Sequence, residues 1–112
     1  MGAVAQLSVT DMRRASRHPV DHEAMGEDRT GAERLLHIVN ISAQGFMIDN
    51  ADGLNRGDRL ILPLPGIGRI EAYVIWVHDT RAGFQFERIL RLDDFKAMMN
   101  RLQPNPRLRR IR

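Results

Sequence analysis

Apolar and polar residues follow the period of a β-strand over most of the chain. Leu35 to Ile41 is rich in branched apolar side chains and predicts a buried strand. Phe46 to Ile48 and Arg59 to Leu64 predict two more strands, and residues 52–58 between them carry turn signals. Val20 to Thr30 is acidic and weakly patterned, so it predicts at best an edge strand.

The strongest strand pattern runs from Arg69 to His78. Its alternation places four apolar residues on one face: Ile70, Ala72, Val74 and Trp76. Asp79 to Gly83 is typical of a hairpin loop, and Phe84 to Phe86 alternates as the returning strand. Short strands separated by turns favour a mainly β fold, a closed or half-closed antiparallel barrel.

One amphipathic helix follows the last strand. Its apolar residues recur at helical spacing: Leu92, Phe95, Met98, Met99 and Leu102. Asp93 and Asp94 near its start suit the helix dipole, and Pro104 ends the pattern. We expect this helix to cover the open end of the barrel, with its apolar stripe in the core.

Length and composition indicate one domain. With 112 residues the chain can build a single core, and we expect a flexible N-terminus over residues 1–11, a domain over 12–103 and a basic disordered tail over 104–112. There is no cysteine, which suits a reducing compartment and excludes disulfides and thiolate metal sites. The sequence lacks a long apolar run and a signal peptide, so we expect a cytoplasmic protein without membrane insertion.

The charge pattern suggests an anionic ligand or partner. The formal net charge is +3, the basic residues gather at both ends, and every one except Lys96 is arginine. A guanidinium group binds phosphate, or the acceptor edge of guanine, through two parallel hydrogen bonds. Charge alone leaves a nucleotide, a nucleic acid and an acidic protein surface open as partners.

Catalytic patterns are missing from the sequence. The four histidines are scattered without metal-ligand spacing, Ser42 does not stand in a nucleophile elbow, and no acid–base pair is evident. We therefore expect no enzyme activity, no catalytic residue, no metal site and no cofactor.

Two segments carry the binding hypothesis. Arg13, Arg14 and Arg17 form an R-x-x-x-R cluster near the N-terminus, and Asn40, Ser42 and Gly45 form N-x-S-x-x-G where a strand ends. Taken singly, a cluster of this kind is more often a solvated tail, and the second segment is more often a turn.

Together, in this order and about two dozen residues apart, the two segments resemble the paired signature of the PilZ domain, a bacterial receptor for cyclic di-GMP. The resemblance covers roughly residues 12–102. It implies a six-stranded antiparallel barrel with one C-terminal helix and a flexible N-terminal arm.

The resemblance also implies roles for single residues. Arg13 and Arg17, with Arg14 as an auxiliary, would hold guanine edges and phosphates of cyclic di-GMP. The other guanine would lie among Asn40, Ser42 and Gly45. Trp76 matches a position where some members place an aromatic residue near the ligand, although a packing role is about as common for such a tryptophan. The ligand could bind singly or as a stacked pair.

The resulting hypothesis is a receptor in which the ligand orders the N-terminal arm and an unidentified downstream protein recognises the change. One alternative is a nucleotide-independent protein-interaction module. A second is a nucleic-acid-binding barrel, which the single Trp and single Tyr disfavour because stacking platforms need exposed aromatic residues.

Overall fold

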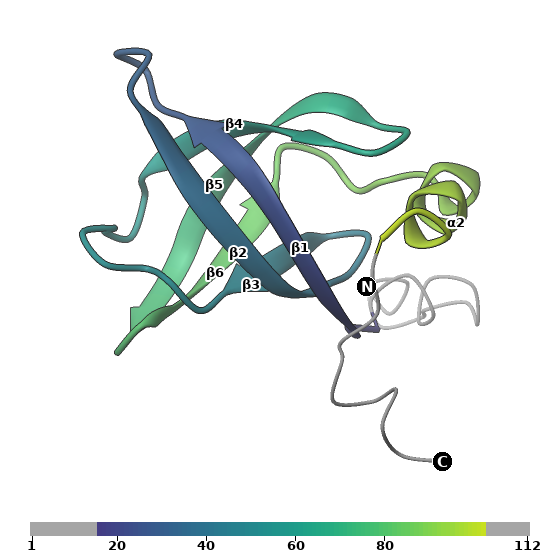
Figure 1. The fold of residues 1–112 in the computed structure, drawn as a ribbon, viewed down its shortest axis with the longest axis horizontal. Coiled ribbons are helices and arrows are strands. Elements are labelled where there is room, and N and C mark those ends of the chain that lie inside the picture. Colours follow the sequence, from purple (N-terminus) through teal and green to yellow (C-terminus); the bar gives the residue numbers. More distant parts are fainter. Residues whose placement is uncertain (1–15, 103–112) are drawn as a thin grey trace, which may run out of the picture.

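The computed structural model describes residues 16–102, which form a closed antiparallel barrel and one helix (Figure 1). The strands and helix are β1 (His18–Glu27), β2 (Glu33–Ile41), β3 (Gly45–Ile48), β4 (Arg59–Leu64), β5 (Gly68–His78), β6 (Arg81–Phe86) and α2 (Leu92–Met99). Their order around the barrel is β1-β2-β3-β6-β5-β4, and β4 pairs with β1 to close it. The predicted six-stranded barrel with a C-terminal helix is confirmed. Arg13, Arg14 and the predicted flexible N-terminus and basic tail lie outside the described residues.

Inward-facing side chains of all six strands fill the barrel. In β4 the alternation is complete, because Leu60, Leu62 and Leu64 are buried while the residues between them are exposed. The aromatic rings of Phe46 and Phe84 stack at 4.6 Å between centroids, on the adjacent strands β3 and β6. Since the barrel is closed, every strand has a hydrogen-bonded neighbour on both sides.

The predicted edge strand in the Val20 to Thr30 region is wrong. β1 pairs with β2 on one side and β4 on the other. Its pattern looked weak because its inward positions include Ala24 and Gly26, which are small. A Cβ on Gly26 would lie 2.9 Å from Leu36 Cδ1, so the leucine fills the space that a larger residue would need.

The predicted hairpin loop after β5 is too long. Arg81, Ala82 and Gly83 already belong to β6, and His78 pairs directly with Arg81. Only Asp79 and Thr80 turn the chain, with Asp79 in the left-handed region at φ 55°. A two-residue turn of this kind suits the twist of antiparallel strands, and acidic or amide residues tolerate its positive φ.

The expected face of Trp76 is also wrong. A register shift between Val74 and Trp76 marks a bulge in β5. Val74 pairs with the buried Phe84, whereas Trp76 pairs with Gly83, whose strand neighbours both point inward. Trp76 therefore lies on the outer face of the barrel, because a bulge inserts one residue and reverses the alternation after it.

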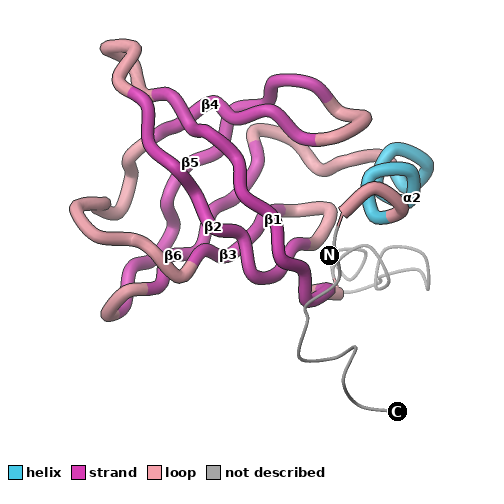
Figure 2. The backbone as a smooth tube through the Cα atoms, viewed as in Figure 1, coloured by secondary structure: helices cyan, strands magenta, loops and turns pink. Residues whose placement is uncertain are grey.

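The helix lies at one end of the barrel, beside the β2–β3 turn and the start of β1 (Figures 1 and 2). Phe95, Met98 and Leu102 are buried in the core, and the Phe95 ring lies 5.4 Å from that of His18. The Leu90 N–H donates to the carbonyl of Ala43 at 2.9 Å and fixes the link before the helix. The predicted core role of the apolar stripe is confirmed for these three residues. Within residues 16–102, none of the helical structure has the length and hydropathy needed for a membrane span.

Candidate functional site

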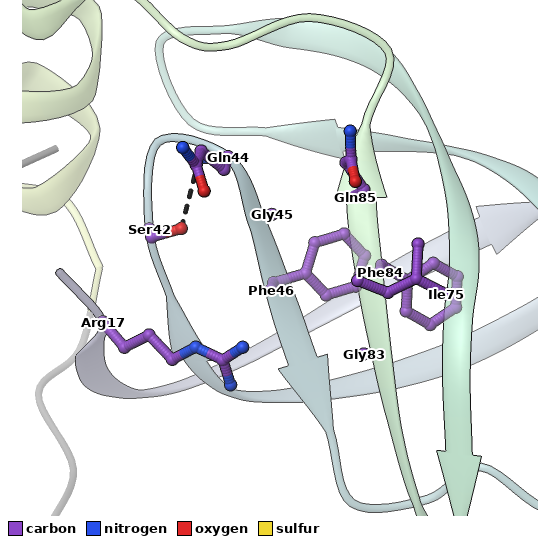
Figure 3. Close-up of a pocket in the computed structure, with 9 residues that line it drawn as sticks. All are labelled: Arg17, Ser42, Gln44, Gly45, Phe46, Ile75, Gly83, Phe84 and Gln85. Atoms are coloured by element: carbon purple, nitrogen blue, oxygen red, sulfur yellow. Dashed lines mark hydrogen bonds between the residues drawn. The ribbon is translucent and has the colours of Figure 1, made fainter. Parts of the chain in front are cut away.

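A small pocket opens where the β2–β3 turn meets the outer surface of β5 and β6 (Figure 3). Its volume is about 170 Å³. Strands β3, β5 and β6, the turn, and the residue that precedes β1 contribute its lining: Arg17, Ser42, Gln44, Gly45, Phe46, Ile75, Gly83, Phe84 and Gln85. The structure thus brings together Arg17, Ser42 and Gly45, three of the residues predicted from the sequence.

The turn is held by its own backbone and by Ser42. The Ser42 N–H donates to the carbonyl of Gly45 at 2.8 Å, and Ser42 Oγ accepts a hydrogen bond from the Gln44 N–H at 3.1 Å. Ser42 is 6% exposed and is the only buried polar residue within 16–102. Because a hydroxyl both accepts and donates, its proton is left to bind an acceptor in the pocket.

Gly45 allows β3 and β6 to approach closely. A Cβ at this position would lie 1.9 Å from the carbonyl oxygen of Phe84 and 3.0 Å from Gln85 Cα. Such a contact is far inside van der Waals range, so only glycine fits without moving a strand. The glycine is required by packing, whether or not a ligand is bound.

The electrostatics of the pocket favour an anion. Arg17 is exposed, and its guanidinium group points toward the strand that carries Gly45 (Figure 3). Among the described residues of the lining it is the only charged group, and the other polar side chains are those of Ser42, Gln44 and Gln85. Pockets that enclose a whole small molecule usually exceed about 300 Å³. This one has room for a single base or phosphate group of a larger ligand.

Asn40 does not line the pocket. It pairs with Met47 and Pro19 across the sheet, and its Nδ2 lies 3.8 Å from Met47 Sδ. Its Oδ1 is buried and has no hydrogen-bond partner among residues 16–102. An unsatisfied buried acceptor costs free energy, so this atom is ready to accept a hydrogen bond.

Trp76 lies next to the pocket but is not part of its lining. A Cβ on Gly83 would lie 2.1 Å from Trp76 Nε1, so the indole ring covers this glycine directly. Gly83 lines the pocket, and Ile75, in the bulge before Trp76, does too.

Sequence reasoning missed several residues of the lining. Gln44 stands within the second motif, and Gln85 alternates with the buried Phe84 and Phe86, so both could have been predicted to face outward. Ile75 and Gly83 had no such signal, because the bulge that presents Ile75 and the ring that covers Gly83 depend on the pairing of β5 with β6.

A second polar cluster, also missed from the sequence, lies around His37 on β2. His37 Nε2 is 2.8 Å from Asp21 Oδ1, and its Nδ1 is 2.8 Å from Asp49 Oδ1. The hydrogen bond to Asp21, helped by that to Asp49, raises the pKa of His37 above its ordinary value. Burial instead lowers the pKa of the nearby His22. Only the protonated His37 ring can donate a hydrogen bond from both nitrogens, one to each carboxylate. Because Asp21 lies on β1 and Asp49 follows β3, these two hydrogen bonds link β1 and the end of β3 through β2.

Comparisons with known proteins show the family of the chain and solved structures of similar fold. The sequence model of the PilZ domain matches residues 11–102. No curated protein matches the chain. The crystal structure of the PilZ domain of CeSA from a cellulose-synthesizing bacterium is similar, with 15% identity, a TM-score of 0.56, and 79% of this chain and 95% of that chain covered. The Bacillus subtilis inhibitor of motility, MotI/DgrA, is also similar, with 22% identity and a TM-score of 0.55. That match covers 86% of this chain and 51% of MotI/DgrA, so the chain spans about half of its length.

Proposed function

The chain belongs to the PilZ domain family, whose members are non-catalytic receptors that generally bind cyclic di-GMP, and from this premise we propose that it binds cyclic di-GMP at the Arg17–Ser42–Gly45 pocket. The single observation that carries the proposal is the convergence of two sequence motifs. Arg17 ends the first motif, Ser42 and Gly45 belong to the second, and they line one pocket although 25 positions separate Arg17 from Ser42.

The chemistry of the pocket suits part of this ligand. Cyclic di-GMP carries two phosphates, and each guanine presents two acceptors, O6 and N7, to a guanidinium fork. Arg17 supplies such a fork, and Ser42 and Gln85 supply neutral donors and acceptors around it. Since the pocket holds about 170 Å³, the rest of the ligand would lie over the outer surface of the barrel.

The remaining predicted residues complete the proposal. We assign Arg13 and Arg14 to the phosphates and guanine edges, because they precede Arg17 by only a few residues. The unsatisfied Asn40 Oδ1 would accept a hydrogen bond from the ligand or a bridging water. Trp76, next to the pocket, would pack against the ligand's outer surface. Binding would draw the arginine motif onto the β2–β3 turn, and a downstream protein would recognise the changed surface.

Isothermal titration calorimetry of the full chain with cyclic di-GMP tests the assignment. We expect Arg17→Ala to weaken binding about 10- to 100-fold, because a hydrogen bond to a charged group contributes about 1.5–3 kcal/mol. Arg56→Ala is the matched control: it removes the same charge from an exposed residue in the loop between β3 and β4, away from the pocket lining. Equal losses in both variants would indicate a diffuse electrostatic surface, and no heat with the wild-type chain would reject the ligand.

Further titrations test the specificity of the pocket for guanine and the number of ligand molecules that bind. Cyclic di-AMP has the same phosphate ring but lacks guanine O6, so we expect it to bind more weakly; equal affinity would remove the guanine contacts from the proposal. The stoichiometry of the cyclic di-GMP titration distinguishes one bound molecule from a stacked pair. Added salt should weaken binding, because the contacts are charge-assisted.

A further inference from the structure

Three strands, β2, β1 and β4, are neighbours in the barrel (Figure 1), and their outer face exposes an apolar patch. Met25 and Leu35 are directly opposed across β1 and β2, and each is 44% exposed. Ile61, which is 38% exposed, lies on β4 opposite Glu27, two residues after Met25 on β1. Pro63 is the next outward residue of β4. We call these four residues the β1–β2–β4 patch: Met25, Leu35, Ile61 and Pro63.

Carboxylates flank this patch along β1 and β2. Glu27 and Glu33 are directly opposed across β1 and β2, and Glu23 is the next outward residue of β1 beyond Met25. Like charges in direct cross-strand pairs destabilise a sheet. Arg69 forms an ion pair with Glu27 at 2.7 Å, but Glu23 and Glu33 have no ion-pair partner within residues 16–102. Glu23 and Glu33 therefore give the rim negative charge that no ion pair among the described residues compensates.

The form of the sheet restricts what can bind here. Because the barrel is closed, β1, β2 and β4 each already have a neighbouring strand on both sides, which disfavours the addition of a further strand. An occupant must use side chains, with apolar groups for the patch and cations for its rim. The chain itself contains such a sequence in residues 107–112, where four arginines alternate with Leu108 and Ile111.

The length of chain after the helix is sufficient for this contact. The 5.4 Å separation of the His18 and Phe95 rings puts α2 beside the start of β1. Met25 is seven residues beyond His18, which at roughly 3.3 Å per residue is about 23 Å along the strand. Ile111 lies nine residues after Leu102, so an extended chain can carry it up to about 30 Å from that residue.

From this complementarity we propose that residues 107–112 bind the β1–β2–β4 patch of the same chain. Leu108 and Ile111 cover the apolar side chains of the patch, and the arginines neutralise Glu23 and Glu33, which lack an ion-pair partner within residues 16–102. Nothing in the contact involves the nucleotide pocket, so the proposal stands or falls independently of the ligand assignment.

Paramagnetic relaxation tests the contact in the full chain. Because the chain has no cysteine, Arg112→Cys provides a single site for a nitroxide label. With ¹³C-methyl methionine, we expect the Met25 methyl signal to be lost in the oxidised sample and to return on reduction or at high salt. A Met25 signal that is unchanged by the oxidised label would overturn the proposal.

Two surface variants make the test specific. Leu35→Asp should restore the Met25 signal, whereas Ile89→Asp should not, since Ile89 is 57% exposed and lies outside the patch. In the reduced sample, where the label broadens no signal, an unchanged chemical shift of the buried Met98 methyl reports that each variant is folded, and Leu35→Thr replaces Leu35→Asp if that check fails. Restoration by both aspartates would reject the patch as the site. In a mixture of nitroxide-labelled chains without ¹³C and ¹³C-methyl chains without nitroxide, the proposal predicts no loss of the Met25 signal. A loss in this mixture would mean that a second copy of the chain occupies the patch, and would overturn the proposal.

Discussion

The contact between Gly83 and Trp76 allows a quantitative test of the barrel's packing. An alanine Cβ at residue 83 would lie 2.1 Å from Trp76 Nε1, 2.5 Å from Cε2 and 2.8 Å from Cδ1. Since carbon contacts are favourable at about 3.5–4.0 Å, the indole ring would have to retreat by roughly 1.5 Å. Gly83 does not have a positive φ, so the steric contact with Trp76 is the main obstacle to a side chain there.

The expected cost follows from two opposed effects. Forcing a methyl group into a packed contact costs about 1–3 kcal/mol, while replacing glycine by alanine within a strand gains about 0.5–1 kcal/mol. Gly83→Ala should therefore lower the free energy of unfolding by about 1–2 kcal/mol in the wild-type background. In the Trp76→Ala background the obstacle is gone, and the same change should be neutral or stabilising.

A double-mutant cycle measured by urea unfolding, with circular dichroism as the signal, tests this reasoning. We expect a coupling free energy of about 1.5–3 kcal/mol between the two positions. The fluorescence of Trp76, the only tryptophan of the chain, should also shift to the red in Gly83→Ala as the ring becomes more exposed. An equal destabilisation by Gly83→Ala in both backgrounds would refute the packing that we describe.

Three other predictions concern stability. Gly45→Ala should lower the free energy of unfolding by more than about 3 kcal/mol, because the added methyl group would meet the backbone carbonyl of Phe84. The loss should be the same in the Trp76→Ala background, and a smaller loss there, measured by urea unfolding, would contradict this. Leu36→Ala should cost about 2–5 kcal/mol, and the adjacent Leu35→Ala about 1 kcal/mol or less even with the tail in contact, since their exposed fractions within the barrel are 0% and 44%. Similar unfolding midpoints of the two variants would contradict the inward position of Leu36 and the outward position of Leu35. The raised pKa of His37 predicts that its stabilising effect is complete below its ordinary value of 6.5 and is lost as the pH rises through the higher folded value. Denaturation of wild type and His37→Gln across pH 5–9 should therefore give a difference of about 1 kcal/mol at acidic pH that disappears at alkaline pH, and a pH-independent difference would rule this out.

Much of the fold is encoded in local sequence patterns. The bounds of the strand Arg59 to Leu64 were predicted correctly, and the turn residues Pro65 and Gly66 follow directly where β4 ends. The helix stripe was equally clear, because helical periodicity depends only on residues a few positions apart. The pairing of Arg17 with Ser42 and Gly45 was also predicted from their order in the chain, and the pocket contains all three.

Three features could be seen only in the tertiary structure, because each depends on contacts between strands. The bulge in β5 moved Trp76 to the outer face and put Ile75 into the pocket, and its position is defined only by pairing with β6. The strand β1 was undervalued because its inward glycine is compensated by Leu36 on a neighbouring strand. His37 looked isolated until the sheet brought Asp21 and Asp49 to its two nitrogens. The sequence by itself thus determined the number and nature of the elements, because these follow from short-range periodicity, and it contains the two motifs as local spacings of residues. Register, bulges and polar clusters required the folded barrel, because they arise between residues far apart in the chain.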